Sequence, residues 1–569
     1  MESFILTIIE QISKLPPNSH EKVWKILHKD GKDLSKTEVL KAYKALVANG
    51  GIKLSLKAEK AFLANIKTKN TRTISGVTPV TVLTKPFPCP GKCIFCPNDY
   101  RMPKSYLSSE PGAQRAFANK FDPYMQTYNR LLAYKNMGHG TDKVELIVLG
   151  GTWSAYPKEY QRWFIKRCFD AMNDFDPENT VERVTLESVM PYSEEDLKQN
   201  EGLVSYNKVV AKAMTSRLHA SQESSTWEEV EVAHNVNETS RIRCVGLVIE
   251  TRPDEINEEE VINIRRLGAT KVQLGVQSLN DKVLSLNKRG HDVAQTALAF
   301  KLLRQAGFKI HVHWMPNLYG SNPEMDKKDF VKLFKNPKFR PDELKIYPCS
   351  LIESAELFDY YKKGLWQPYT NEQLIDVLSF CLSHVPNYCR VTRVIRDISS
   401  EDIVVGNKLT NMRQIVEEAV KKSGGTLDDI RSREVRGRLV ESSELKLRTT
   451  RYTTTNSTEY FFEYICDDND IVGFLRLSLP KDIVCFISEL SGVAIIREIH
   501  VYGETVNIGD KEDGKAQHLG LGKSLISEAK KLAKKHGFAE LAVISSIGTR
   551  EYYRKNGFVD GVLYQSLSL

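Results

Sequence analysis

Short apolar runs alternate with amphipathic segments over the middle of the chain, from about residue 71 to residue 398. The apolar runs predict buried strands at 144–151, 244–250, 271–278, 309–316 and 343–348. Apolar residues at helical spacing predict helices between these strands, for example at 159–172, 258–267, 293–306 and 372–384. Such alternation is typical of a parallel sheet or barrel. We therefore predict a partial (βα) barrel whose functional site lies at the carboxyl ends of its strands.

Different patterns flank this barrel. Residues 1–70 consist of short basic segments with apolar residues at helical spacing, interrupted by pairs of prolines and glycines, which predicts a small helical unit. Residues 399–444 form a predicted linker with several arginines. Residues 445–569 begin with three strand-like runs, followed by a glycine-bearing loop, a helix and a last strand. The acidic stretch 177–240 interrupts the barrel pattern, and we expect an insertion there that is partly helical or mobile.

Composition and charge narrow the class of protein. The chain has 569 residues, of which 41% are hydrophobic and 27% charged, so we expect several globular domains and exclude a disordered chain. No run approaches the roughly 18 apolar residues of a membrane span and no signal peptide is recognised, so we expect a cytoplasmic protein without membrane contact. Residues 1–75 hold 14 basic against 7 acidic residues. This balance favours a phosphate-rich partner such as a nucleic acid, although a solvated helical surface has the same composition.

The cysteines are the first feature that indicates a chemistry. The chain has 10 of them, too few for a disulfide scaffold, yet Cys89, Cys93 and Cys96 lie close together in the sequence CPGKCIFC. A structural zinc site takes four protein ligands, whereas three thiolates on one loop suit a 4Fe-4S cluster with one iron open to another ligand. Zinc and three purely structural cysteines are the less favoured alternatives.

This spacing, Cys-x3-Cys-x2-Cys ahead of strands and helices, resembles the signature of radical S-adenosylmethionine enzymes. The resemblance implies that the open iron binds the amino and carboxylate groups of S-adenosylmethionine, whose cleavage supplies a deoxyadenosyl radical. It also implies that Gly150, Gly151 and Thr152, at the end of the first predicted strand, lie beside that amino group.

Polar residues close two further predicted strands. Glu250 and Arg252 belong to the segment ETRPD, and Gln277 belongs to the segment GVQS. Because the carboxyl ends of barrel strands meet at one mouth, we expect these side chains to bind the ribose or carboxylate of the cofactor, or the substrate. Ion pairing that only closes the barrel is the alternative.

A glycine-bearing loop precedes the helix that begins at about Lys523. Gln517, Gly520 and Gly522 give it the pattern Q-x-x-G-x-G. Backbone N–H groups freed at such a loop form an anion site suited to a pyrophosphate, and a simple helix cap is the alternative. The pattern and its surrounding strands resemble motif A of the GNAT acetyltransferases, which implies that the loop binds the pyrophosphate of acetyl-coenzyme A.

Together the two matches resemble one family, the Elongator catalytic subunit family of tRNA uridine carboxymethyltransferases. The likeness runs over residues 71–176 and 241–569, with specific segments such as NKRGH, REIHVYG and GTREYYRKNGF. It implies an α/β fold in which a partial (βα) radical-SAM barrel is followed by a GNAT domain. It also implies that the deoxyadenosyl radical takes a hydrogen from the acetyl methyl group, and that a carboxymethyl group is finally left on carbon 5 of the wobble uridine of tRNA.

The resemblance assigns roles to further residues. Lys143, in TDKVEL, matches a coenzyme-binding lysine at the barrel and is expected to take part in catalysis. Tyr553 matches a coenzyme-contacting tyrosine that could act as a general acid or could only pack under the loop. The other coenzyme-binding residues implied by motif match are Glu498, Ile499, His500 and Val501 on one strand, and Leu521, Gly522 and Lys523 at the loop.

Two features depart from the family pattern. Eukaryotic members separate the first two cysteines by a longer loop than Cys89 and Cys93 have here, and the insertion at 177–240 is absent from the shorter members. Elsewhere, four residues are candidates for a structural zinc site, because cysteine and histidine suit zinc: Cys349, Cys381, His384 and Cys389. Buried residues without metal are the alternative.

The expected partner is tRNA, bound through its anticodon stem-loop, and a homodimer or a larger Elongator-like assembly is expected. The main alternative function is a protein lysine acetyltransferase in which the iron-sulfur domain is a scaffold. A radical methylthiotransferase acting on tRNA would not need the glycine loop. A non-catalytic tRNA-binding assembly subunit would not need the three cysteines.

Overall fold

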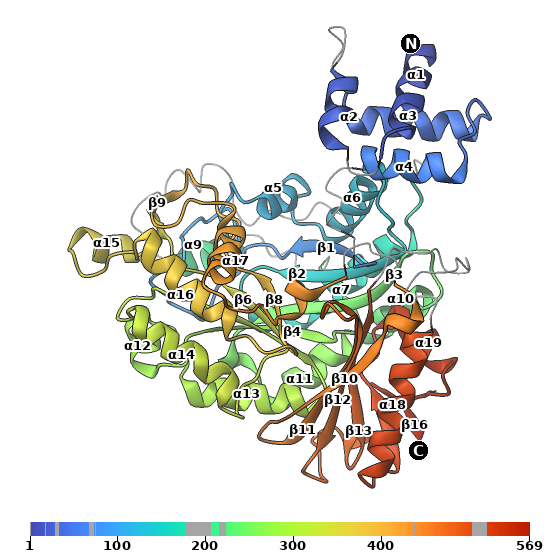
Figure 1. The fold of residues 1–569 in the computed structure, drawn as a ribbon. Helices are drawn as coiled ribbons and strands as arrows, with labels where there is room; N and C mark the ends of the chain where they lie inside the picture. Colours follow the sequence, from blue (N-terminus) through green and yellow to red (C-terminus); the bar gives the residue numbers. More distant parts are fainter. Residues whose placement is uncertain are drawn as a thin grey trace.

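The structure is a computed structural model that describes residues 2–16, 19–28, 34–67, 73, 75–177, 206–215, 223–435, 440–502 and 520–569. A group of helices, a parallel sheet and a mixed sheet follow one another along the chain (Figure 1). The two ends of the chain lie at opposite sides of the molecule (Figure 1). Within the described ranges, no helix is long and apolar enough to cross a membrane.

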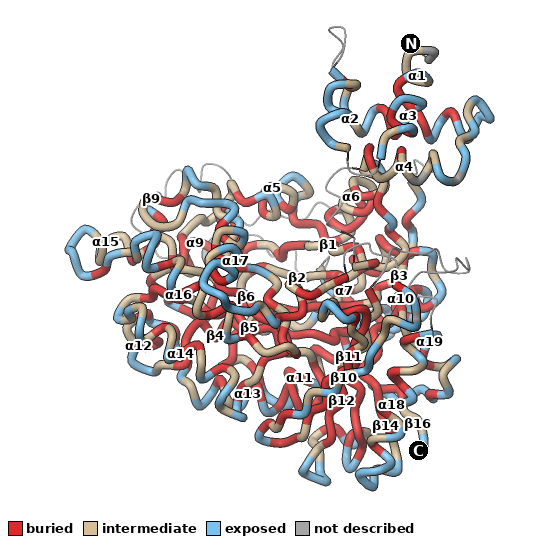
Figure 2. Tube along the Cα trace, viewed as in Figure 1, coloured by how far each residue is buried: buried red, intermediate tan, exposed pale blue. Residues whose placement is uncertain are grey.

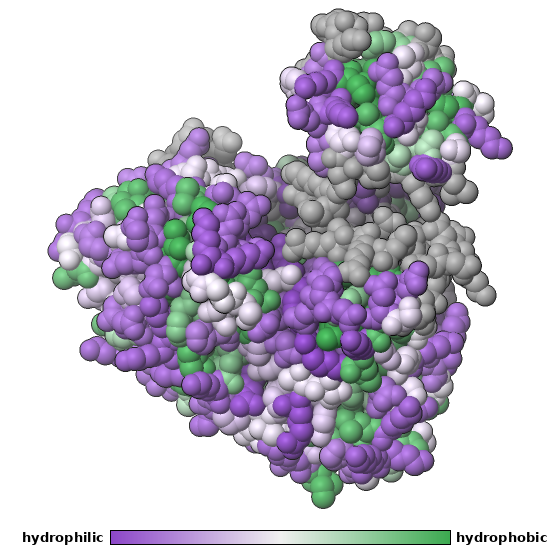
Figure 3. Space-filling view, in the orientation of Figure 1, coloured by the Kyte–Doolittle hydropathy of each residue, from purple (hydrophilic) through white to green (hydrophobic). Residues whose placement is uncertain are grey.

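The N-terminal region folds into helices, as the sequence predicts, and has a core of its own. Its helices are α1 (Glu2–Ser13), α2 (His20–Leu27), α3 (Lys36–Ala48) and α4 (Leu56–Ile66). Ile9, Ile12 and Phe62 are buried between them. Figures 1 and 3 show this unit standing out from the rest of the molecule beside α6 (Pro123–Asn136), with many hydrophilic side chains on its surface. The unit therefore does not contribute to the core of the parallel sheet.

The parallel sheet is the predicted half-barrel. Its strand order is β1-β2-β3-β4-β5-β6-β8, and every neighbouring pair is parallel. The strands are β1 (Thr78–Leu83), β2 (Lys143–Leu149), β3 (Arg243–Thr251), β4 (Lys271–Gln277), β5 (Lys309–Trp314), β6 (Glu343–Ile346) and β8 (Arg390–Arg393). The five predicted strands are thus confirmed as β2 to β6. The edge strands β1 and β8 were not predicted.

Helices cover the outer face of this sheet, and a short two-stranded sheet, β7 (Leu351–Ile352) with β9 (Ile403–Val405), lies near its mouth. Figure 2 shows the strands buried and the outer sides of the helices exposed. The helices besides α6 are α5 (Pro111–Ala118), α7 (Lys158–Asn173), α9 (Tyr206–Thr215), α10 (Trp227–Asn237), α11 (Glu258–Arg266), α12 (Asp281–Leu286), α13 (Val293–Gln305), α14 (Pro323–Lys335), α15 (Leu357–Lys362), α16 (Asn371–Ser383) and α17 (Met412–Lys422).

The mixed sheet forms the second large unit. Its strand order is β10-β11-β12-β13-β14-β16-β15, with β13 and β14 parallel and the other pairs antiparallel. Helix α18 packs against β12 and β13. The elements are β10 (Lys446–Thr453), β11 (Ser457–Ile465), β12 (Ile471–Pro480), β13 (Ala494–Val501), α18 (Leu521–Lys535), β14 (Glu540–Val543), α19 (Arg550–Arg554), β15 (Val559–Asp560) and β16 (Gln565–Ser568).

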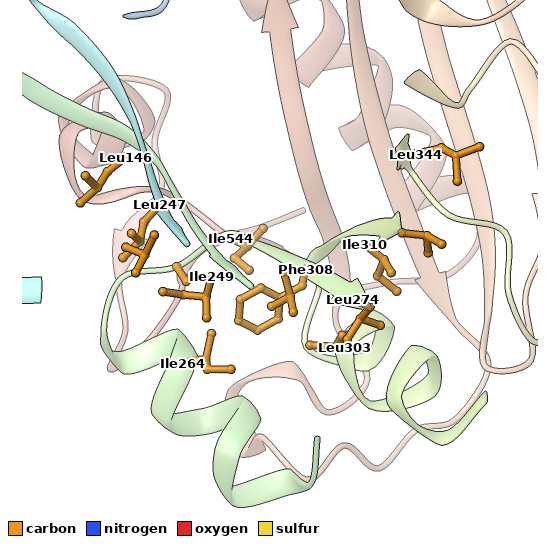
Figure 4. Close-up of a cluster of buried hydrophobic side chains, with 14 of the residues drawn as sticks. Leu146, Leu247, Ile249, Ile264, Leu274, Leu303, Phe308, Ile310, Leu344 and Ile544 are labelled. Carbon is orange, nitrogen blue, oxygen red and sulfur yellow. The ribbon is translucent and has the colours of Figure 1, made fainter. Parts of the chain in front are cut away.

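The two sheets share a continuous core. Ile544, which follows β14, packs among side chains of the parallel sheet and its helices, including Leu303 and Phe308 (Figure 4). A short turn at Gly548 runs so close to β3 that an added Cβ would lie 2.8 Å from the carbonyl oxygen of Cys244. The mixed sheet therefore packs against the end of the half-barrel where the strands begin.

A buried ion network joins the two sheets at the same end. Asp342, just before β6, accepts hydrogen bonds from Arg497 of β13 at 2.7 and 2.8 Å and from Arg304 of α13 at 3.1 Å. Arg497 also donates to Glu459 of β11 at 2.8 Å. All four side chains are at most 2% exposed. Buried charges are tolerated only when they are paired, so this network fixes how the two sheets dock.

Candidate active site

The three clustered cysteines lie on a buried loop that follows β1. Cys89, Cys93 and Cys96 are each at most 9% exposed. Arg289 donates to the sulfur of Cys93 at 3.0 Å, and Arg252 approaches the same sulfur at 3.9 Å. A hydrogen bond with Cys96 and the charges of these arginines outweigh burial and hold the pKa of Cys93 well below its ordinary value. This environment favours the thiolate of Cys93, the form of cysteine that binds metals, whereas the hydrogen bond to Cys93 and burial raise the pKa of Cys96.

The surroundings of the loop fit an iron-sulfur cluster and a polar cofactor. A 4Fe-4S cluster binds each thiolate to a different iron. The three sulfur atoms therefore do not need to converge on a single ion. In the described ranges, no three His, Cys, Asp or Glu residues are placed to hold one ion. Ile94 is fully buried beside the cysteines and shields the loop. The Gln277 side-chain oxygen and Arg289 Nε are buried without a hydrogen-bond partner, which suits a cofactor with polar groups of its own.

The glycine turn after β2 lies against the cysteine loop. Thr152 Oγ1 is 3.6 Å from the sulfur of Cys89. Gly150 has a φ of 150°, and an added Cβ would lie 1.9 Å from Thr84 Oγ1, so only glycine fits there. At Gly151 the nearest atom to an added Cβ would be 3.6 Å away. Thr152 is therefore brought to the cysteine loop, and Gly150 and Gly151 precede it in the same turn.

The polar residues predicted at the barrel mouth make different contacts. Arg252 forms a 2.8 Å ion pair with Asp254 and lies so close to the loop that an added Cβ at Gly91 would be 2.2 Å from its guanidinium. It therefore supports the loop. Glu250 and Gln277 line the cavity, as predicted, and Gln277 has the unusual φ of 68° that turns the chain at the end of β4.

The acidic insertion contributes a residue that the sequence did not single out. In its helix α9, the Asn207 side chain accepts from the backbone N–H of Cys89 at 3.0 Å and donates to the Cys89 carbonyl at 2.6 Å. Tyr206 donates to the carbonyl of Met102 at 2.8 Å. The insertion is thus partly helical in its described residues, and it holds the cysteine loop. The sequence gives no signal for Asn207, because its side chain binds the backbone of Cys89 and no particular side chain is needed there.

A cavity of about 920 Å³ runs along the interior of the half-barrel. Phe95 and Cys96 line it at the cysteine loop, and Glu434 and Arg390 line it toward the other end of the strands. There, Glu434 accepts a hydrogen bond at 3.2 Å from the hydroxyl of Tyr502, the residue after β13. One cavity therefore leads from the cysteine loop toward the strand on which the coenzyme is expected.

Lys143 lies at the end of the barrel that faces the mixed sheet. It is the first residue of β2 and pairs with Arg243, the first residue of β3. Arg243 in turn lies beside the turn at Gly548 of the mixed sheet. Burial lowers the pKa of Lys143. Its position is consistent with a coenzyme held by the mixed sheet and not with direct contact to the cysteine loop.

The parallel pairing of β13 with β14 is short, which leaves a candidate slot for a ligand beside β13. These parallel strands pair only from Ala494 to Ile496, and β13 is irregular at the next position, opposite Arg476. Beyond that point they separate, so the β14 side of β13 has no strand partner among the described residues. A splayed pair with free backbone groups can bind an extended amide chain such as pantetheine. The slot includes the four predicted residues Glu498, Ile499, His500 and Val501.

The side chains at the end of β13 make contacts within the protein. Glu498 forms ion pairs with Lys309 of β5 at 3.2 Å and with Arg476 of β12 at 2.8 Å. His500 is half-buried, and desolvation of its ring lowers its pKa to about 4; the ring lies 4.4 Å from that of Tyr502. Glu498 and His500 therefore have partners within the protein, which leaves the strand backbone as the candidate for binding a ligand.

The glycine loop begins α18, as predicted. Gly520 caps the helix with a φ of 68°, Leu521 is buried beneath it and Lys523 is exposed, while Gln517 lies outside the described residues. An added Cβ at Gly522 would be 2.5 Å from the hydroxyl of Tyr552. The N–H groups of this first turn can bind an anion.

The tyrosine beside the loop is Tyr552, and sequence reasoning singled out its neighbour. Tyr553 is 5% exposed in the core of the mixed sheet, with its ring 5.5 Å from that of Phe558. Burial raises the pKa of Tyr553 well above its ordinary value. This location agrees with the packing role that was the alternative to general acid catalysis. Adjacent tyrosines on a short helix give no sequence signal for which one faces the loop.

The four zinc candidates are not brought together. Cys349 packs with Ile94 and Trp366 near the mouth, whereas Cys381 and Cys389 lie in the core of the parallel sheet. His384 is bound through Nδ1 to the carbonyl of Phe380, 2.7 Å away on its own helix. In the described part of the chain, no group of three or more such residues is placed to hold an ion.

Comparison with known proteins gives three family matches in order along the chain. Residues 217–330 match the radical SAM superfamily, residues 341–422 match the radical SAM C-terminal domain, and residues 427–558 match the acetyltransferase (GNAT) family. The half-barrel and the mixed sheet therefore correspond to these two folds.

Several curated proteins match nearly the whole chain. A tRNA uridine(34) acetyltransferase of Methanocaldococcus infernus is 38% identical over 98% of this chain and 98% of its own length. Elongator complex protein 3 of Homo sapiens is 33% identical over 88% of this chain and 85% of its own. Among solved structures, the Elp3 of Methanocaldococcus infernus with an N-terminal deletion matches with a TM-score of 0.68 at 34% identity, over 87% of this chain and 100% of that chain.

Proposed function

This chain belongs to the family of tRNA uridine(34) acetyltransferases and Elongator complex protein 3, and on that premise we propose that it is a tRNA-modifying acyltransferase. It uses S-adenosylmethionine radical chemistry and acetyl-coenzyme A to form carboxymethyluridine at carbon 5 of the wobble uridine. The observation that carries the proposal is the cavity that leads from the cysteine loop toward β13. A reactive group at one end and a thioester at the other need such a shared space.

The chain's own residues divide the work of holding the cofactors. Cys89, Cys93 and Cys96 hold the cluster, and the turn at Gly150 together with Gln277 receives S-adenosylmethionine. When bound, this cofactor supplies the radical chemistry that no side chain can. The slot along β13 and the first turn of α18 hold acetyl-coenzyme A, with its pyrophosphate at Gly522 and Lys523.

Two features bear on the alternative of a protein lysine acetyltransferase with an iron-sulfur scaffold. A scaffold would not need two arginines aimed at one cysteine sulfur. It also would not need a cavity inside the half-barrel that runs from the cysteine loop and is lined by many charged side chains. Both features favour the tRNA reaction. Assembly as a homodimer or a larger complex, and a location in the cytoplasm, stay predictions.

The direct test is anaerobic incubation of the reconstituted protein with reductant, tRNA, S-adenosylmethionine and acetyl-coenzyme A, followed by mass spectrometry of the tRNA nucleosides. Carboxymethyluridine is expected with the full mixture and not when any one component is left out. Acetylation of a protein lysine without S-adenosylmethionine, with no change in the uridine, would support the alternative function.

Replacing Lys143 by alanine should lower tRNA-dependent turnover of acetyl-coenzyme A while the iron content stays at the wild-type level. Lys143 lies where the half-barrel meets the mixed sheet and far from the cysteine loop, so its loss should affect the thioester and not the cluster. The measurements are free thiol release and iron per chain. Lys338→Met, at an exposed position, is the control. Wild-type turnover by the Lys143 variant would remove this residue from the coenzyme site.

Deleting residues 1–69 should weaken tRNA binding and reduce its dependence on salt. The segment carries much of the positive charge, and each tRNA phosphate that it neutralises adds about 0.7 to 0.9 to the steepness of log affinity against log salt. Because α1 to α4 have a separate core, the half-barrel should stay folded. The measurement is tRNA affinity at several salt concentrations. An unchanged slope would show that these helices do not bind tRNA phosphates.

A further inference from the structure

The cavity of the half-barrel has two unlike walls. Strands β1 and β2 line it mainly with apolar side chains, among them Leu83, Ile147 and Leu149, although Thr81 and Glu145 also face it. Strands β3 to β6 and β8 line it mainly with charged and polar side chains. Barrel interiors are normally filled by branched apolar residues, so the polar wall indicates a binding chamber and not a core. A flat ring with a polar edge has both an apolar face and polar groups to match such a lining.

A small network holds the polar wall in place near the mouth. The Gln273 side-chain oxygen accepts a hydrogen bond from His313 at 2.9 Å and another from Lys345 at 2.5 Å. On the other side, Glu250 accepts a hydrogen bond from the hydroxyl of Tyr106 at 3.3 Å. These contacts use one donor of Lys345 and one oxygen of Glu250. The remaining groups of both side chains are free to face the cavity.

Lys345 and Glu250 have opposite charges in one chamber but do not form a direct ion pair. Among the described residues, no ion pair of 4.0 Å or less joins them, and the imidazole of His313, whose pKa burial holds well below its ordinary value, lies 3.7 Å from Glu250 Oε1. Burial lowers the pKa of Lys345 to about 8 and raises that of Glu250. Both charges are thus costly as they stand. A ligand that presents an acceptor next to a donor would relieve both costs at once.

We propose that Lys345 and Glu250 recognise the base-pairing edge of the wobble uracil, an inference that rests on the function proposed above. Uracil presents O4, N3–H and O2 in a row, so Lys345 donates to a carbonyl oxygen while Glu250 accepts from N3–H. Cytosine has an amino group in place of O4 and an acceptor in place of N3–H, so the same two side chains oppose it. Unstacked RNA bases are commonly read in this way at their base-pairing edge.

The test compares binding of two anticodon stem-loops, identical except for uridine or cytidine at the wobble position, to the full-length reconstituted protein. The wild type should prefer the uridine stem-loop by about tenfold to a hundredfold, the usual discrimination of one well-formed pair of base contacts. Lys345→Met should bring the preference close to one. Glu250→Gln should also bring the preference close to one, by weakening the binding of the uridine stem-loop and strengthening that of the cytidine stem-loop. The second effect is expected because an amide can also donate to the N3 of cytosine. Lys338→Met should leave the preference unchanged.

The outcomes separate this inference from the proposed function. Retention of the wild-type preference in both variants overturns the inference, and so does a wild type without any preference. Weaker binding of S-adenosylmethionine with an unchanged base preference would assign the pair to the cofactor and also overturns it. The increased affinity of Glu250→Gln for the cytidine stem-loop cannot arise from misfolding. Whether the wild type forms carboxymethyluridine is measured separately and bears only on the proposed function.

Discussion

Replacing Cys93 by alanine is expected to abolish both the formation of deoxyadenosine and the modification of uridine. The pKa of Cys93 is held well below its ordinary value, because Cys96 donates a hydrogen bond to its sulfur and the charges of Arg289 and Arg252 lie beside it. A 4Fe-4S cluster with one open iron has no spare protein ligand, so loss of one thiolate leaves the cluster incomplete. The measurements are iron per chain after anaerobic reconstitution and deoxyadenosine by chromatography. Wild-type protein should take up about four irons.

The matched control is Cys485→Ala, a partly exposed cysteine in the mixed sheet unit. It should keep the iron, the deoxyadenosine and the modified uridine of the wild type. Binding of zinc at the three cysteines, with no iron taken up under anaerobic conditions, would contradict the assignment.

Replacing Asp342 by asparagine should destabilise the protein by about 3 to 5 kcal/mol, the usual cost of leaving buried charged partners unpaired. Although burial alone would raise it, the charges of Arg304 and Arg497 hold the pKa of Asp342 far below its ordinary value. The loss should affect both sheets, because the carboxylate joins them. Denaturant unfolding followed by probes in each sheet measures this. Asp359→Asn, on the surface of α15, should change the stability by no more than about 0.5 kcal/mol.

The same pKa fixes the expected dependence on pH. A carboxylate whose folded pKa is depressed contributes stability above its unfolded value, about 3.9, and loses it as the pH falls. The difference in stability between wild type and Asp342→Asn should therefore be full at neutral pH and shrink below about pH 4. A difference that stays constant into acid would show that folding does not shift the pKa of this carboxylate.

The central strands could be predicted from the sequence because the run at 244–250 is almost continuously apolar, while the run at 271–278 alternates apolar with polar residues at the period of a strand. Strands β1, β8 and β10 were missed because threonine, proline and arginine interrupt their apolar residues. Such edge strands form because a neighbouring strand supplies half of their hydrogen bonds. The residues of an edge strand give no indication of this contribution.

The site was predictable where the chemistry is local and not where it depends on contacts distant in sequence. The spacing of the three cysteines, the turn at Gly150 and the loop at Gly522 each form within a few residues. Arg289, by contrast, reaches Cys93 from 196 positions away, and Asn207 reaches Cys89 from 118 positions away. Lys345 became a candidate only when the fold showed that it shares a cavity with Glu250.

The central claim is that one cavity brings the acetyl group to the radical chemistry of the cysteine loop. The most direct measurement uses acetyl-coenzyme A with a deuterated methyl group, in an anaerobic reaction with tRNA and S-adenosylmethionine. Mass spectrometry should find deuterium in the deoxyadenosine and two deuterons in the substituent on the wobble uridine. Deoxyadenosine without deuterium, together with an unlabelled uridine and acetyl groups on protein lysines, would contradict the account.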